Sequence, residues 1–211
     1  MPKRFRASRA LAPACAGLVS ALVLVLVPTP AATTLAARAA DGEPREAAPV
    51  SRPTAHVFSF DAIDGGRIDL ADFRGRPILV VNTASRCGFV NQLAGLQTLH
   101  ERYGPRGLVV LGVPSNDFRQ ELADEAAIAA FCEGTYGVTF PLAARTRVVG
   151  EAAHPFYAWA ARERPGEAPR WNFHKYLVGR DGTIAATFFT PTEPTDPRIR
   201  AAIERALREG A

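Results

Sequence analysis

Two uninterrupted apolar runs constrain the fold of this chain more than any other feature. They are "PILVVN" (77–82) and "GLVVLGVP" (107–114). A strand with one solvated face alternates apolar and polar residues, whereas a strand covered on both faces is apolar throughout. Both runs therefore predict central strands of a sheet that carries helices on its two faces, which is the layered α/β class.

The segments around these runs predict further layers. "HVFSF" (56–60) predicts a strand, and the turn residues Asp64-Gly65-Gly66 follow it. After Gly88 the apolar residues recur with helical spacing until Gly104 closes the helix. A second helix is expected from Asp124, with Gly134 as its stop.

The last third of the chain predicts two helices and a hairpin. Residues 154–163 predict a helix, and Arg180-Asp181-Gly182 separates two strands of a β-hairpin. Asp196 is expected to cap the final helix, with Pro197 as its first residue. The order of elements predicts a central mixed β-sheet flanked by helices, in one domain over 52–211.

The first 40 residues have the three parts of a secretory signal peptide. A basic start precedes an apolar run over 11–27, and an alanine-rich exit follows. We therefore predict a signal peptide over 1–40, which is either cleaved or kept as a membrane anchor, and a flexible linker over 41–51. The protein is expected to be exported, to the periplasm.

The basic composition belongs to this leader. Five of the 25 Lys and Arg residues precede Asp41, while all 21 Asp and Glu residues lie from Asp41 onward, so the remainder has a formal net charge of −1. This balance argues against a nucleic-acid partner. The four histidines (His56, His100, His154 and His174) show no metal-ligand spacing, and no phosphate or dinucleotide motif is present. No metal or prosthetic cofactor is predicted.

Cys87 stands alone where the apolar run gives way to a helical pattern, in "VNTASRCGFVNQ" (81–92). At or near a helix N-terminus, unpaired N–H groups and the positive end of the helix dipole stabilise a thiolate, and Arg86 lies beside it. Val90 occupies the place of the second cysteine of a C-x-x-C redox motif. Cys87 is thus either a reactive nucleophile or a small buried hydrophobic residue.

Three alternatives apply to Cys132, which lies on an apolar helix face with Ile128 and Phe131. It packs in the core, it forms a structural disulfide with Cys87, or it is a resolving thiol that attacks a sulfenic acid on Cys87. Its spacing from Cys87 does not choose among them. The third cysteine, Cys15, lies in the leader.

Three further polar candidates lie at expected sheet ends. Gln120 follows the second central strand, at the end where such sheets bind ligands. Trp171 and Asn172 directly precede a predicted strand.

Four segments resemble the glutathione peroxidase family: "VNTASRCGF", "VPSNDFRQE", "FCEGTYGVTFP" and "WNFHKYLVGRDG". They occur in the family's order and at close to its spacing, so the resemblance covers about residues 52–208. It implies a thioredoxin fold and a thiol peroxidase that reduces hydrogen peroxide and organic or lipid hydroperoxides.

The resemblance also implies roles for single residues. Cys87 would be the peroxidatic cysteine, and Gln120, Trp171 and Asn172 would complete a catalytic tetrad of hydrogen-bond donors. Cys132 falls where thioredoxin-dependent members carry their resolving cysteine. A thioredoxin-like protein or glutathione would be the thiol reductant, and the short stretch between "FPL" and "WNF" implies a monomer.

The sequence departs from the family pattern around the second motif. The loop from Phe118 to Gln120 is one residue shorter than usual, Arg119 stands where glycine is common, and Ser115 replaces a frequent cysteine. An exported thiol–disulfide exchanger and a redox sensor are the alternative functions. Any membrane contact is expected through the leader or through lipid hydroperoxides.

Overall fold

The computed structural model describes residues 52–209. The predicted signal peptide (1–40) and linker (41–51) therefore lie outside the described residues. Among the residues described, no helix has both the length and the apolar character needed to cross a membrane.

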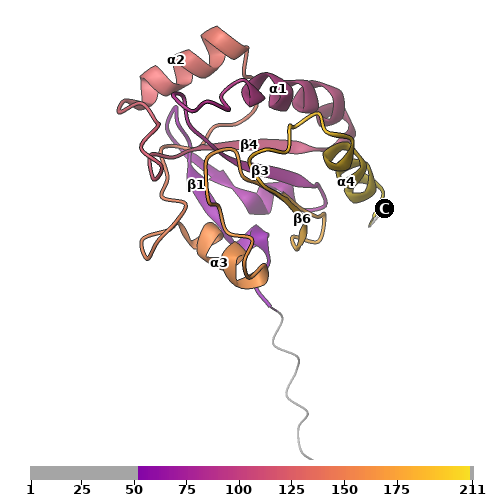
Figure 1. The fold of residues 1–211 in the computed structure, drawn as a ribbon. Helices are drawn as coiled ribbons and strands as arrows, with labels where there is room; N and C mark the ends of the chain where they lie inside the picture. The colour runs from indigo at the N-terminus through magenta and orange to yellow at the C-terminus, as the bar shows by residue number, and fades with distance from the viewer. Residues whose placement is uncertain (1–51, 210–211) are drawn as a thin grey trace, which may run out of the picture. The chain divides into compact units, whose positions relative to one another are not determined.

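A four-stranded mixed sheet with the order β4-β3-β5-β6 forms the centre (Figure 1). β3 (Ile78–Thr83) pairs in parallel with β4 (Val109–Pro114), and on its other side it pairs antiparallel with β5 (Lys175–Val178). β6 (Ile184–Phe188) completes the predicted hairpin with β5. Every residue of β3 and β4 is buried, which confirms the prediction from the two apolar runs, and β5 is buried as well.

β4 is buried although it is the edge strand, because the segment around Leu142 covers it. The amide N–H of Gly112 donates to the carbonyl of Pro141 at 3.0 Å, and the amide of Ala143 donates to the carbonyl of Gly112 at 2.8 Å. A Cβ on Gly112 would lie 2.6 Å from the Leu142 side chain and 3.1 Å from the Phe140 ring, so a larger residue here would force these side chains to move. These bonds occupy the backbone groups of Gly112 on the edge that β4 would otherwise offer to another chain.

Helices cover both faces of the sheet. α1 (Gln92–Tyr103), α2 (Glu125–Tyr136) and α4 (Pro197–Arg208) pack into one apolar core on the upper face in Figure 1. A second core lies on the opposite face of the sheet, between the strands and α3 (Pro155–Glu163). The short hairpin β1 (Ser59–Asp61) and β2 (Arg67–Asp69) contributes to this second core. Three 3₁₀ segments complete the elements: η1 (Ala55–Val57), η2 (Leu70–Phe73) and η3 (Gly104–Arg106).

Two predicted boundaries are wrong. The segment 56–60 is not one strand, since the β1–β2 ladder ends at Ser59. Residues 56 and 57 belong to η1, whose Ala55 amide donates to the Gly182 carbonyl in the β5–β6 turn at 2.8 Å. α2 does not stop at Gly134 but continues to Tyr136, and the left-handed backbone of Gly137 (φ 64°) then ends the helix. Glycine within a helix costs stability without necessarily ending it, whereas a left-handed C-cap does end it.

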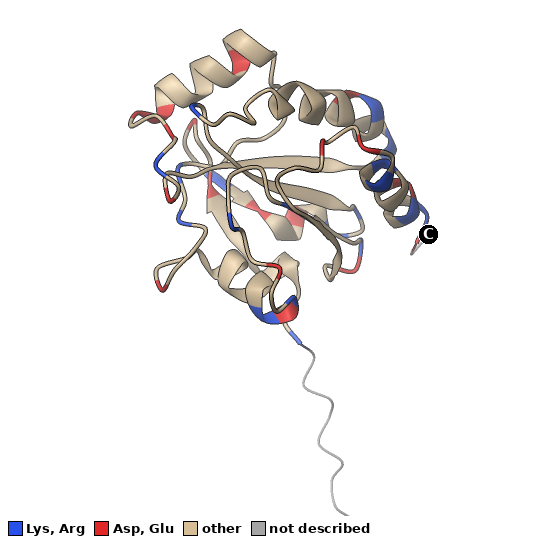
Figure 2. Ribbon diagram, viewed as in Figure 1, with Lys and Arg blue, Asp and Glu red and all other residues tan. Residues whose placement is uncertain are grey.

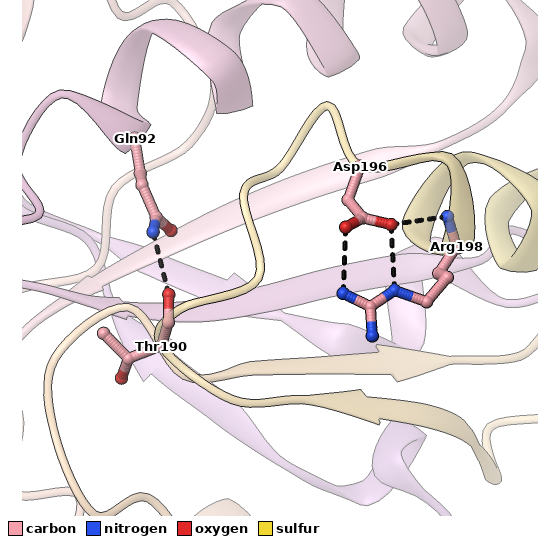
Figure 3. A network of polar contacts seen from close by, with 4 residues as sticks. All are labelled: Gln92, Thr190, Asp196 and Arg198. Atoms are coloured by element: carbon pink, nitrogen blue, oxygen red, sulfur yellow. Dashed lines mark hydrogen bonds and ion pairs between the residues drawn. The ribbon is translucent and has the colours of Figure 1, made fainter.

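Predicted caps position two helices. The Asp124 side chain accepts from the Ala127 amide at 2.8 Å, and that of Asp196 accepts from the Arg198 amide at 2.8 Å. Figure 2 shows several basic positions along the ribbon of α4. Arg198, in the first turn of α4, also pairs with Asp196 at 2.9 Å (Figure 3). α1 is joined to the segment before α4 by Gln92, whose Nε2 donates to the Thr190 carbonyl at 2.8 Å (Figure 3).

Candidate active site

The topology brings three distant segments to one edge of the sheet. β3 and β4 are parallel, so the turn after β3 and the loop after β4 leave at the same edge. β5 runs antiparallel to β3, so the segment that precedes β5 arrives there too. Cys87, Gln120 and Asn172 belong to these three segments, one residue to each.

Asn82, near the end of β3, ties the segment before β5 to the sheet. Its Nδ2 donates to the Trp171 carbonyl at 3.1 Å, and its Oδ1 accepts from the His174 amide at 3.1 Å. Its own carbonyl accepts from the Phe173 amide. Phe173 has a left-handed backbone (φ 62°), a conformation that costs energy for a residue with a Cβ and persists where surrounding contacts fix it.

Cys87 is buried, with 2% of its surface exposed, in a turn that precedes α1. The helix itself begins only at Gln92, so the thiol lies before the N-terminus rather than in the first turn. Its carbonyl accepts from the Val90 amide at 3.0 Å, which starts a series of turns leading into α1. Within residues 52–209, the Cys87 sulfur accepts one hydrogen bond, from the Phe89 amide at 3.5 Å.

Gln120 and Asn172 are in direct contact. Asn172 Nδ2 donates to Gln120 Oε1 at 3.0 Å, which leaves the Nε2 amide of Gln120 as a donor. The Gln120 carbonyl accepts from the Arg86 amide at 2.8 Å, next to Cys87 in the chain. Backbone bonding thus holds the Gln120 loop against the Cys87 turn.

Trp171 is 40% exposed and stands at the rim of this group. Its ring packs against Phe118 with 5.4 Å between centroids, and its carbonyl is held by Asn82. In the part of the chain that the structure describes, the indole N–H has no hydrogen-bond partner. The ring is therefore positioned by its backbone and by Phe118.

Glu121 is a site residue that the sequence did not indicate. Its carboxylate is buried, and Oε1 accepts from the Ser85 amide at 3.0 Å and from the Leu122 amide at 2.8 Å. Oε2 is buried with no partner within the described residues. Glu121 thus joins the Cys87 turn to the Gln120 loop. Its position directly after Gln120 was the available signal, but charged residues after a strand are usually solvated.

Cys132 lies on the inner face of α2, 2% exposed, in the same apolar core as Cys87. The two cysteines are free thiols in this structure, so no structural disulfide joins them here. Burial and, secondarily, the negative charge of Glu121 raise the pKa of the Cys132 thiol to about 12. In this conformation Cys132 is protonated at neutral pH.

A mixed sheet with helices on both faces and a cysteine in the turn after its central strand defines a thioredoxin-fold thiol protein. The glutathione peroxidase family model matches residues 55–161. Hydroperoxy fatty acid reductase gpx1 of Synechocystis sp. is 42% identical over 164 residues, which cover 73% of this chain and 96% of that protein. Thioredoxin/glutathione peroxidase BtuE of Escherichia coli is 36% identical over 169 residues, which cover 69% and 92%.

A solved structure agrees with these relatives. The crystal structure of Trgpx in its apo form matches with a TM-score of 0.61 and 32% identity over 75% of this chain and 98% of that one. The chain belongs to the glutathione peroxidase family, and it is a peroxidase.

Proposed function

We propose that this protein reduces hydroperoxides with Cys87 as the peroxidatic thiol and Cys132 as the resolving thiol. The observation that carries this proposal is the convergence of the Cys87 turn, Gln120 and Asn172 at one sheet edge through the contacts Arg86–Gln120 and Asn172–Gln120 (2.8 and 3.0 Å). A thiol–disulfide exchanger is disfavoured because Val90 replaces the second cysteine of C-x-x-C.

In the first step the Cys87 thiolate attacks one oxygen of the hydroperoxide. An S–O bond forms, the O–O bond breaks, and the alkoxide leaves as an alcohol after taking up a proton, or as water when the substrate is hydrogen peroxide. Gln120, Asn172 and the Trp171 indole supply N–H donors for the sulfur anion and for the charge that develops on the leaving oxygen. Cys87 is left as a sulfenic acid.

In the second step the sulfur of Cys132 attacks the sulfenic acid, forming the disulfide and releasing water. Because both thiols are buried, α2 must open locally first. α2 is suited to opening, since Ile128 and Cys132 are its only two buried residues within the described chain. A helix with few buried apolar contacts opens at a lower free energy than the core.

A thiol reductant then returns the disulfide to two thiols. BtuE, the relative named as a thioredoxin/glutathione peroxidase, supports a thioredoxin-like protein or glutathione as this reductant. We propose the monomer as the working form, supported by the short stretch between "FPL" and "WNF" in the sequence.

The test is stopped-flow reaction of the reduced protein with hydrogen peroxide, followed by thiol counting and mass analysis. The proposal predicts fast loss of two thiols and a Cys87–Cys132 disulfide. Cys87→Ser should abolish the reaction. Cys132→Ser should keep the first turnover at a similar rate but block recycling by a thioredoxin-like protein, and sustained recycling in that variant would overturn the resolving role.

We also propose export to the periplasm through residues 1–40, supported by their charge and hydropathy pattern. Expression of the full chain in a Gram-negative host, followed by fractionation and intact mass, tests this. The expected product is periplasmic, and its mass shows whether the leader is cleaved. Reversal of the charges at Lys3, Arg4, Arg6 and Arg9 should retain the protein in the cytoplasm; periplasmic recovery of that variant would contradict the proposal.

A further inference from the structure

Two successive backbone carbonyls beside the Asn172 side chain are held by the side chains of other residues. Thr190 Oγ1 donates to the Asn172 carbonyl at 2.6 Å. Lys175 Nζ donates to the Phe173 carbonyl at 2.7 Å. All four residues are buried, so both bonds are shielded from water. The backbone that carries Asn172 is thus fixed from the interior of the protein.

Gln92 joins the two donors. It is the first residue of α1, it is buried, and its Oε1 accepts from Lys175 Nζ at 2.7 Å. Its Nε2 donates to the Thr190 carbonyl at 2.8 Å (Figure 3). Lys175, Gln92 and Thr190 therefore form one buried polar network. Because α1 follows the Cys87 turn, this network ties the segment of the nucleophile to the segment of Asn172.

Lys175 is a costly residue to bury. Its side chain is fully buried on β5, and it forms no ion pair within residues 52–209. Burial of an amine costs free energy that an apolar side chain of similar size does not. Its two bonds reach groups that position the Asn172 segment: the Phe173 carbonyl directly, and Thr190 through Gln92. These bonds account for a lysine at this place.

The Phe173 carbonyl needs such a donor because its residue is strained. Phe173 has φ 62°, in the left-handed region that a residue with a Cβ occupies where surrounding contacts fix it. Without these contacts the backbone would relax toward a negative φ, and the adjoining Asn172 would turn with it. The bond from Asn172 Nδ2 to Gln120 Oε1, now 3.0 Å, would then be lost.

We propose that Lys175, Gln92 and Thr190 are positioning residues for the reduction of peroxide. They hold the Asn172 backbone so that the side-chain amide of Asn172 contacts Gln120 and faces the reacting sulfur and oxygen. The inference rests on the proposed roles of Cys87 and Asn172. None of the three residues touches the peroxide, and each acts on the rate through Asn172.

The experiment measures the second-order rate constant for single-turnover oxidation of the reduced full chain by hydrogen peroxide. Thr190→Val removes the hydroxyl with little change of shape, and the rate constant should fall about three- to tenfold, as expected for one buried hydrogen bond. Thr190→Ser keeps the hydroxyl and should recover most of the rate. An unchanged rate with valine, or an equal fall with serine and with valine, would overturn the proposal.

A double-mutant cycle with Asn172 separates positioning from general support of the fold. Asn172→Ala should lower the rate constant, and adding Thr190→Val to it should lower the rate constant no further. Lys175→Met should behave in the same way, slowing the reaction only while Asn172 is present. If the effects multiply instead, these residues act elsewhere and the proposal is overturned.

Tyr103→Phe is the matched control for the loss of one hydroxyl. It removes the bond from Tyr103 to Glu204 Oε1 (2.9 Å) at the other end of α1 and should leave the rate constant unchanged. An equal loss of rate in Tyr103→Phe and Thr190→Val would trace both to lower stability, which also overturns the proposal. Failure of the wild-type protein to react, or an Asn172→Ala variant as fast as the wild type, would instead refute the proposed function of Cys87 or of Asn172.

Discussion

At the scale of single residues, Arg119 has a left-handed backbone conformation that glycine adopts more easily. Its φ is 58°, in the left-handed region where the Cβ of an L-residue crowds the following carbonyl. Arg119 stands where the glutathione peroxidase family commonly has glycine. The backbone explains that preference: the turn before Gln120 requires a positive φ.

Arg119→Gly should therefore stabilise the protein. Relief of the left-handed conformation is worth about 1–2 kcal/mol, and the extra freedom of glycine in the unfolded chain offsets about 0.5–1 kcal/mol of it. The net rise in the free energy of unfolding, measured by urea denaturation, should be about 0.5–1 kcal/mol. Arg74→Gly is the control, because Arg74 is exposed with φ −52° and should give a loss. A loss at both positions would show that Arg119 is not strained.

The sequence predicted some site residues better than others. Cys87, Gln120 and Asn172 were identified from motifs, and the structure brings their segments together. Glu121 was missed because its importance comes from its burial and from its contact with the Ser85 amide, which is distant in the sequence. No local pattern encodes a carboxylate that the fold encloses.

At the scale of elements, α2 combines a firm start with a weakly held body. Asp124 caps it, but Gly134 lies in its last turn with open space around the position of a Cβ. Glycine inside a helix costs about 1 kcal/mol relative to alanine. The glycine thus lowers the free energy for opening the helix turn next to Cys132.

Gly134→Ala should slow disulfide formation between Cys132 and Cys87. Stabilising α2 by about 0.5–1 kcal/mol reduces the open population by about two- to fivefold. Ala130→Gly, at an exposed position of the same helix, should speed the step by a similar factor. Quenched-flow mass analysis after a peroxide pulse measures both, while sulfenic acid formation on Cys87 should be unchanged. Equal disulfide rates in the two variants would contradict opening of α2 as the controlling step.

The elements themselves were predictable to different degrees. The apolar runs identified β3 and β4, and the aspartate caps identified the starts of α2 and α4, because these signals are local. The strand predicted at 56–60 failed because its pairing depends on where β2 ends. Likewise, the Leu142 segment covers β4 through a contact between residues distant in the sequence, and the periodicity of apolar residues cannot predict such a contact.

At the scale of the whole molecule, Lys175 joins parts of the fold that lie far apart in the sequence. It is fully buried on β5, and its Nζ donates to Gln92 Oε1 on α1 and to the Phe173 carbonyl, both at 2.7 Å. Gln92 in turn bonds Thr190 in the segment before α4. Burial lowers the pKa of Lys175 to about 7, although Glu193 opposes this shift, and a neutral amine still has two N–H groups for its two partners.

The stability of the whole protein should therefore rise with pH across the range in which only the unfolded chain protonates Lys175. That range extends from about 7, the folded pKa, to 10.5, the ordinary value. The unfolded state binds more protons there, so the free energy of unfolding increases by up to about 1.4 kcal/mol per pH unit. The contribution is complete above pH 10.5 and is lost as the pH falls toward 7.

Urea denaturation of the reduced protein between pH 7 and pH 9 measures this slope. Above pH 9 the raised pKa of Cys132 lowers the free energy of unfolding as the pH rises, so the measurement stops there. Lys175→Met should flatten the slope, because methionine fills a similar volume and carries no proton to titrate. Gln92→Met removes a neutral partner of the same amine and should lower stability while keeping the slope. If Lys175→Met retains the pH dependence of the wild type, Lys175 is charged in the folded protein at pH 9, and its two acceptors compensate for the burial of the charge.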